Sequence, residues 1–128
     1  MRARGSRLIL VVDDDADLLG LVETVLREEG YVVATATNGK DALMHIENEL
    51  PMLILLDMKM PVMDGWEFAA TFRAKYDRLV PIVVLTGAQD PKAWAEEIQA
   101  AGSLTKPFDL DQLIATVKRY VVDVDKPD

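Results

Sequence analysis

The stretch that decides the fold is Leu53-Ile-Leu-Leu-Asp57, in which four apolar residues are followed directly by a carboxylate. Two more runs have a similar composition, Leu8-Ile-Leu-Val-Val12 and Ile82-Val-Val-Leu85. Their apolar residues are continuous and do not alternate with polar ones, which is typical of a strand covered by helices on both faces of a parallel sheet. We therefore predict that these three runs are the central strands of an α/β domain.

Two further segments predict the outer strands of the same sheet. Tyr31 to Thr35 is more polar, which suits a strand at the sheet edge, and Leu104-Thr105 predicts a very short fifth strand. The segments between the five strands carry apolar residues at helical spacing. The predicted helices are centred on residues 18–26, 42–46, 68–72, 91–101 and 110–117.

Residues typical of helix ends mark where these helices begin and end. Gly30 follows the first helix as a stop signal. Asp90-Pro91 predicts an N-cap and a first helical residue for the fourth helix, which we expect to end near Ala101, stopped by Gly102. Asp109 is predicted to cap the fifth helix.

Five strand-then-helix units in a row predict a doubly wound α/β domain with helices on both faces of the sheet. Ligands of such domains bind beyond the carboxyl ends of the strands, where the strand order reverses. The residues that directly follow the predicted strands are Asp13, Asp14, Asp57, Thr86 with Gly87, and Lys106 with Pro107. We therefore expect three carboxylates, one hydroxyl and one ammonium to converge at one edge of the sheet.

Three carboxylates at one edge predict a metal site. Like charges raise one another's pKa and destabilise the fold, and a hard divalent cation relieves this repulsion. Oxygen ligands with one open side suit Mg²⁺, which can also accept a phosphate oxygen. One carboxylate can then attack phosphorus, while Lys106 and the Thr86 hydroxyl neutralise the phosphoryl oxygens. Asp15, next to the cluster, could instead cap the following helix.

The composition of the chain excludes several functions. The 128 residues include 14 basic and 22 acidic ones, for a net charge of −8, so nucleic acid is a poor candidate for a direct partner. The absence of cysteine excludes a disulfide framework and thiol catalysis, and it is compatible with the reducing cytoplasm. No apolar run approaches the roughly 20 residues that span a bilayer, so no membrane association is predicted.

The length of the chain fits one domain, which we predict over residues 8–122. No internal repeat or low-complexity linker divides it. Residues 1–7 are predicted to form a disordered lead, and residues 123–128 an acidic tail.

Four segments of the chain together resemble the receiver domain of response regulators in two-component signalling. The segments are Val11-Val-Asp-Asp-Asp15, Leu56-Asp-Met-Lys-Met-Pro-Val-Met-Asp-Gly65, Val84-Leu-Thr-Gly-Ala88 and Leu104-Thr-Lys-Pro-Phe108. The resemblance extends from about Leu8 to Val122. It implies a flavodoxin-like (βα)5 domain of the stand-alone type, with five parallel strands in the order 2-1-3-4-5.

The resemblance also implies a role for each strand-end residue. Asp57 would accept a phosphoryl group from a phosphohistidine. Lys106 would contact the phosphate, and its peptide bond to Pro107 would be cis. The implied Mg²⁺ ligands are Asp14, Asp57 and the backbone carbonyl of Lys59, with Asp13 acting directly or through water.

Family membership implies protein partners for this chain. The phosphodonor would be a sensor histidine kinase or a histidine phosphotransfer protein, and an unknown downstream protein would dock on the face formed by the fourth and fifth helices. A homodimer is compatible with the family. The protein would be cytoplasmic and would catalyse only its own phosphorylation and dephosphorylation, so we do not expect it to be an enzyme with a separate substrate.

The sequence departs from the family pattern near the fifth strand. The family usually has Tyr or Phe three residues before the lysine, where this chain has Ser103, and the segment from Thr86 to Lys106 is slightly short. We hypothesise that the signal passes through the fourth helix and its flanking loops by another packing change. Lys59 stands two residues after Asp57, beside the entrance for attacking water, and predicts an altered lifetime of the phosphate.

Three other functions compete with this one. A phosphatase of the haloacid-dehalogenase type would need a second Asp two residues after Asp57, where Lys59 stands. A flavin or nucleotide binder would need a phosphate loop rich in Gly, Ser or Thr after the first strand, where this chain has Asp13-Asp-Asp-Ala16. A degenerate receiver that serves only as a docking module is the third alternative, which Ser103 favours and the complete set of strand-end residues disfavours.

Overall fold

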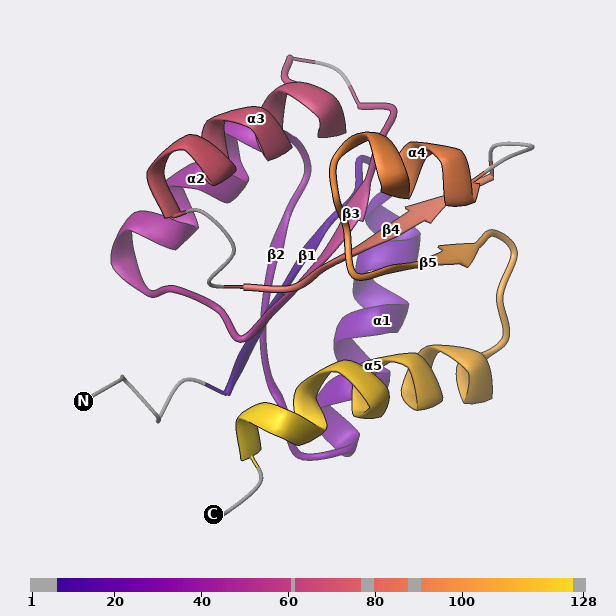
Figure 1. The fold of residues 1–128 in the computed structure, drawn as a ribbon. Helices are drawn as coiled ribbons and strands as arrows, with labels where there is room; N and C mark the ends of the chain where they lie inside the picture. Colours follow the sequence, from indigo (N-terminus) through magenta and orange to yellow (C-terminus); the bar gives the residue numbers. More distant parts are fainter. Residues whose placement is uncertain (1–6, 61, 77–79, 88–90, 126–128) are drawn as a thin grey trace.

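The structure, a computed structural model, describes residues 7–60, 62–76, 80–87 and 91–125 (Figure 1). Strands and helices alternate along the chain as predicted. The elements are β1 (Leu8–Val12), α1 (Ala16–Glu28), β2 (Val32–Ala36), α2 (Gly39–Asn48), β3 (Leu53–Asp57), α3 (Gly65–Tyr76), β4 (Ile82–Thr86), α4 (Pro91–Glu97), β5 (Gly102–Thr105) and α5 (Leu110–Asp125).

The five strands form one parallel sheet in the order β2-β1-β3-β4-β5, which confirms the predicted topology. Val12, at the end of β1, lies between Ala36 of β2 and Leu56 of β3. The strand order reverses at β1, because the chain adds β2 on one side of it and β3 on the other. Ligand sites of doubly wound sheets lie at this point, beyond the carboxyl ends of the strands.

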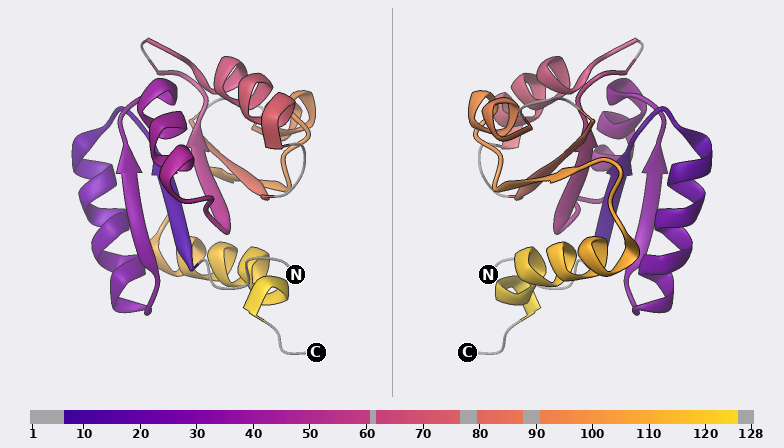
Figure 2. Two further views of the ribbon diagram at one scale, coloured as in Figure 1. Left: turned by 90° about the vertical axis from the view of Figure 1, so that its left-hand side faces the viewer. Right: turned by 90° about the vertical axis from the view of Figure 1, so that its right-hand side faces the viewer.

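Helices cover both faces of the sheet (Figure 2). Side chains of Ile9 and Leu55 pack in one core with α1 and α5. Those of Leu10 and Leu56 pack in a second core with α2, α3 and α4. Because alternate residues of a strand point to opposite faces, a strand between two helical layers needs apolar residues at every position. This double burial explains the continuous apolar runs of the sequence.

Polar side chains cap several helices. The Asp15 carboxylate accepts hydrogen bonds from the backbone N–H groups of Asp17 and Leu18 at 3.1 and 3.2 Å, so this residue caps α1. Asp109 caps α5 as predicted, because its carboxylate accepts from the Gln112 N–H at 2.7 Å and the Gln112 side chain accepts from the Asp109 N–H at 2.9 Å. Each such cap satisfies N–H groups that the first turn of a helix leaves unpaired.

The segment between α4 and β5 differs from the prediction. The helix ends at Glu97, not near Ala101, and Gly102 begins β5 and does not stop a helix. Gln99 has a positive φ of 56°, and the Ala100 N–H donates back to the Ala95 carbonyl at 2.8 Å, a pattern that ends a helix. The Ala101 N–H then donates to the Ile82 carbonyl of β4 at 2.8 Å. A side chain at Gly102 would collide with the Tyr120 hydroxyl group of α5, which explains the glycine. The predicted cap Asp90 lies outside the described residues.

The remaining differences concern element ends. β2 begins and ends one residue later than predicted, and α5 continues to Asp125, past the predicted boundary at residue 122. Within the described ranges, no helix has both the length and the apolar composition that crossing a bilayer requires.

Candidate functional site

Three carboxylates, two directly after β1 and one at the end of β3, converge at the carboxyl edge of the sheet. Each of Asp13, Asp14 and Asp57 places a carboxylate oxygen within 4.8 Å of the other two. Asp13 is 0 % exposed and Asp57 is 6 % exposed, whereas Asp14 is open to solvent. The strands β1 and β3 are parallel neighbours in register, so the residues that follow them meet at the same level. The predicted convergence is confirmed.

The backbone holds Asp13 in place. Its N–H donates to the Ala36 carbonyl at 3.0 Å, which extends the pairing of β1 with β2. Its carboxylate accepts a hydrogen bond from the Asp15 N–H at 2.9 Å. The first contact comes from the end of β2 and the second from the N-cap residue of α1, so the position of Asp13 depends on both elements.

Lys106 reaches the cluster from β5, across the intervening β4. Its Nζ lies 2.6 Å from Asp13 Oδ2 and 3.8 Å from Asp57 Oδ2. Its N–H donates to the Thr86 carbonyl at 2.9 Å, which fixes the end of β5 beside the end of β4. The Lys106–Pro107 peptide bond is cis, as the family resemblance implied. The predicted ammonium therefore lies among the predicted carboxylates.

The pKa of Asp57 is raised from 3.8 to about 6. Burial of the carboxyl group is the largest cause, and the carboxylates of Asp13 and Asp14 also raise it. The Lys106 ammonium and a hydrogen bond from the Lys59 backbone act in the opposite direction but do not cancel the effect. Asp57 is therefore a buried carboxyl group with two carboxylates beside it, which the Lys106 ammonium offsets only in part. A cation bound there would stabilise the ionised form of Asp57.

A pocket of about 330 Å³ opens beside Asp57, and its other lining residues are Lys59, Thr86, Gly87 and Trp94. Thr86 is the buried last residue of β4, and Gly87 is exposed and has open space where a side chain would be. Both residues therefore lie where the sequence predicted, beside the Asp57 carboxylate. The pocket is large enough for a tetrahedral anion.

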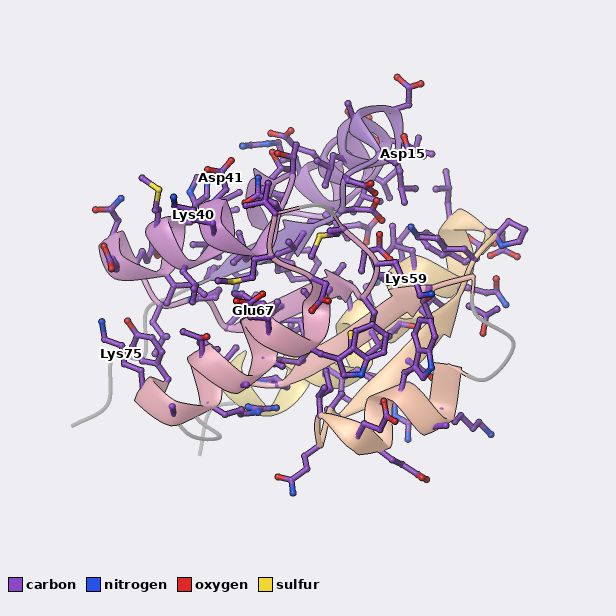
Figure 3. All side chains as sticks on the ribbon, turned by 90° about the horizontal axis from the view of Figure 1, so that it is seen from above. Asp15, Lys40, Asp41, Lys59, Glu67 and Lys75 are labelled. Atoms are coloured by element: carbon purple, nitrogen blue, oxygen red, sulfur yellow. The ribbon has the colours of Figure 1, made fainter. Side chains whose placement is uncertain are left out.

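Trp94 also lines this pocket, a position that the sequence did not predict for it. The centroid of its indole ring lies 5.5 Å from the Lys59 Nζ. Figure 3, which shows the molecule from above, labels Lys59. The two residues come from the β3–α3 loop and from α4, so no local sequence signal could have paired them.

The fold and the site together define a doubly wound α/β protein with an acidic, lysine-paired pocket at the point where the strand order reverses. Residues 9–118 match the family model described as response regulator receiver domain. The chain belongs to the response regulator receiver domain family.

The chain is similar to curated regulators and to solved receiver structures. It is 42 % identical over 112 residues to the transcriptional regulatory protein PrrA of Mycobacterium bovis, covering 86 % of this chain and 48 % of that protein. It is 38 % identical to the probable transcriptional regulator ycf27 of Pyropia yezoensis, covering 92 % of this chain and 49 % of that protein. It therefore spans about half the length of these curated relatives.

Two solved structures show the same fold at higher mutual coverage. The chemotaxis protein CheY4 of Vibrio cholerae superposes with a TM-score of 0.83 at 32 % identity, covering 91 % of this chain and 99 % of that one. The receiver domain of NtrX from Brucella abortus superposes with a TM-score of 0.81 at 31 % identity, covering 88 % of this chain and 97 % of that one.

Proposed function

We propose that this protein is a phosphoacceptor response regulator in which Asp57 receives a phosphoryl group from a phosphohistidine of a sensor histidine kinase or a histidine phosphotransfer protein. The observation that carries the proposal is the position of the Asp57 carboxylate. It lies within 4.8 Å of two other carboxylates, 3.8 Å from an ammonium, and against a pocket that suits a tetrahedral anion.

The proposed reaction balances without a further reactant. A carboxylate oxygen of Asp57 attacks phosphorus, the P–N bond to the imidazole breaks, and its electron pair stays on the histidine nitrogen. The product is an acyl phosphate on Asp57. In dephosphorylation, water attacks phosphorus and the bond between phosphorus and the Asp57 oxygen breaks. The protein thus acts on its own phosphoryl group, and we do not assign it a separate substrate.

The acidic cluster fits the Mg²⁺ that receiver domains bind. Its donors are carboxylate oxygens, the hard ligands that Mg²⁺ prefers. Burial raises the pKa of Asp57, and the negative charges of Asp13 and Asp14 add to this effect. We assign Asp14, Asp57 and the backbone carbonyl of Lys59 as ligands, with Asp13 binding directly or through water. When bound, the ion supplies positive charge for the phosphoryl oxygens.

The remaining strand-end residues complete the neutralisation of charge. Lys106 already lies between Asp13 and Asp57, so its ammonium is positioned to contact a phosphoryl oxygen on Asp57. The Thr86 hydroxyl lines the pocket and can donate to another oxygen. Gly87 leaves the approach to phosphorus open. The complete set supports phosphorylation over the docking-module alternative.

We propose that output passes through contact with another protein. The relatives PrrA and ycf27 carry names of transcriptional regulators, and the net charge of −8 argues against direct contact of this chain with nucleic acid. A downstream protein would dock on the face formed by α4 and α5. Homodimerisation is a second candidate protein contact. The domain limits 8–122, the stand-alone organisation and the cytoplasmic location stay predictions of the sequence.

Acetyl phosphate and Mg²⁺ test the proposal. The full chain should gain the mass of one phosphoryl group, and acid or base should remove it. The Asp57→Asn variant should gain none, whereas Asp41→Asn, which changes an exposed carboxylate on α2, should match the wild type. A chain that gains no mass would instead be a docking module.

A further inference from the structure

Four side chains form a continuous contact from the rim of the Asp57 pocket to α3 and α4. The Lys59 Nζ lies 5.5 Å from the centroid of the Trp94 ring. Trp94 packs edge-to-face on Trp66, with ring centroids 4.8 Å apart and an interplanar angle of 64°. The Trp66 Nε1 donates to Glu97 Oε1 at 2.8 Å. We call these residues the Lys59–Trp94 relay.

Trp94 lines two pockets at once. One is the pocket beside Asp57, and the other is a neighbouring pocket of about 460 Å³ that Trp66, Met58 and Asp64 also line. Lys59 belongs to both linings, and its side chain is exposed on a loop. Its ammonium can therefore exchange the Trp94 ring for an anion in the Asp57 pocket without unfolding any element.

The charges of the site give this exchange a cause. Lys106 lies 2.6 Å from Asp13, so it is already paired before phosphorylation. A bound divalent cation and Lys106 together would balance the charge of the three carboxylates. Phosphorylation of Asp57 replaces one negative charge with two, which would leave one negative charge in excess. Among the described residues that line the pocket beside Asp57, Lys59 is the one that carries a positive charge. A charge-assisted hydrogen bond to a phosphoryl oxygen is stronger than an exposed cation–π contact.

We infer that Trp94 is a positioning residue that holds the Lys59 ammonium at the rim of the Asp57 pocket, and that a phosphoryl group draws Lys59 off the Trp94 ring. This inference rests on the proposed phosphorylation of Asp57. The loss of its cationic partner frees Trp94 and, through Trp66 and Glu97, alters how α3 and α4 pack. The relay gives α4 a response to phosphorylation that does not need an aromatic residue at Ser103.

Tryptophan emission tests this inference directly, because Trp66 and Trp94 are the two tryptophans of the chain. In a Trp66→Phe background, Trp94 is the single reporter, and Phe keeps an aromatic ring against it. Acetyl phosphate is added to the Mg²⁺-loaded protein, and the emission change is divided by the phosphoryl occupancy measured by intact mass. We expect a change in emission per phosphoryl group that disappears when Lys59→Met is added.

A matched control separates loss of this contact from loss of any lysine–aromatic contact. Lys75 lies 5.5 Å from the Tyr76 ring on α3, so Lys75→Met removes a cation–π pair of the same length away from the pocket. This control should leave the emission change intact. The inference is wrong if phosphorylated protein shows no change, or shows the same change with Lys59→Met. Absence of mass gain would instead overturn the proposed function.

The dephosphorylation rate tests whether Trp94 acts through Lys59. Trp94→Leu removes the ring face, whereas Trp94→Phe keeps one. We expect Trp94→Leu to change the rate in the direction opposite to Lys59→Met, because a lysine with no ring to leave contacts the phosphoryl oxygen more readily. Trp94→Phe should restore most of the wild-type rate, and the Trp94→Leu/Lys59→Met double variant should match Lys59→Met alone. Additive effects would show that the two residues act independently and would overturn the inference.

Discussion

The carboxyl edge of the sheet has two sides that are built differently. On the β1–β3 side, the buried carboxylates lie at or directly after the end of a strand, and strand pairing fixes the backbone that carries them. On the α4 side, Lys59 and Trp94 come from a loop and a helix of seven residues, and only side chains join them. The β1–β3 side suits chemistry that needs fixed geometry. The α4 side suits side chains that rearrange when Asp57 is phosphorylated.

This comparison also explains how charge is handled on the two sides. Asp13 and Lys106 form a short, largely buried ion pair, in which each partner would be costly to leave alone. Lys59 is exposed, and its contact with Trp94 can be given up at small cost. Substitutions on the strand side should therefore have larger effects than those on the α4 side.

The largest effect is expected for Lys106→Met. The variant loses the ammonium that faces Asp13 and Asp57, so both the phosphoryl oxygens and the carboxylates lose their positive partner. Phosphorylation by acetyl phosphate should slow by about 10²–10³-fold, the usual cost of removing one charge-stabilising donor. Intact mass against time measures the rate, and Lys40→Met on α2 should be unaffected. A change of less than threefold in Lys106→Met would contradict the larger effect expected for the strand side.

The pH dependence of stability tests the strand side without a phosphodonor. The folded-state pKa of Asp57 is raised from 3.8 to about 6, so the folded state binds this proton more tightly than the unfolded chain does. The resulting stabilisation is fully present below pH 3.8 and is lost as the pH rises through about 6. At neutral pH, without metal, Asp57→Asn should therefore be more stable than the wild type, by up to about 3 kcal/mol.

Urea denaturation in EDTA measures this difference. The advantage of Asp57→Asn should shrink as the pH falls below about 6, where the wild-type carboxyl becomes protonated. Saturating Mg²⁺ should also remove it, because the ion stabilises the ionised wild type. An advantage that is the same at every pH would show that packing, and not charge, separates the two proteins.

A third prediction concerns the strand that carries Lys106. Gly102→Ala should destabilise the fold by about 1–3 kcal/mol, because the new methyl group meets the Tyr120 hydroxyl and the neighbours must shift. Gly20→Ala, at an exposed α1 position with open space, should instead stabilise by up to about 1 kcal/mol. Urea denaturation compares the two. Adding Tyr120→Phe should recover part of the loss; no recovery would refute the steric explanation.

The smallest effect is expected on the α4 side, for Lys59→Ala. Loss of a cation beside the entrance for attacking water should speed loss of the phosphoryl group by about two- to fivefold, since an exposed ion pair contributes up to about 1 kcal/mol. Decay of the phosphorylated mass after removal of acetyl phosphate gives the rate. An unchanged rate would remove Lys59 from any role in the phosphate lifetime, and a change as large as that of Lys106→Met would erase the contrast between the two sides.

Much of the strand side could be predicted from the chain alone. Continuous apolar runs identified β1, β3 and β4, and the residue after each run was assigned to the carboxyl edge because parallel strands all end there. Asp13, Asp57, Thr86 and Lys106 lie where that rule places them. The caps Asp15 and Asp109 could also be predicted from the sequence, because capping depends on residues within one helical turn.

The predictions that were wrong lie between α4 and β5. Asp90-Pro91 as a start and Gly102 as a stop extended the fourth helix to Ala101, but the helix ends earlier. Gln99 has a positive φ of 56°, and the Ala101 N–H already donates to the Ile82 carbonyl of β4. The reason for Gly102 lies in α5, where Tyr120 occupies the space that a side chain would need. A local pattern contains no information about either neighbour.

The order of apolar and polar residues by itself determined which carboxylates, hydroxyl and ammonium meet at one edge. Each strand ends where its apolar run ends, and parallel strands all end at the same edge of the sheet. The tertiary structure alone decided that Trp94 stands over Lys59 and that Trp66 binds Glu97, 31 residues further along the chain. Those contacts depend on how separate helices pack on a common sheet, and that packing is a property of the whole core and of no single segment.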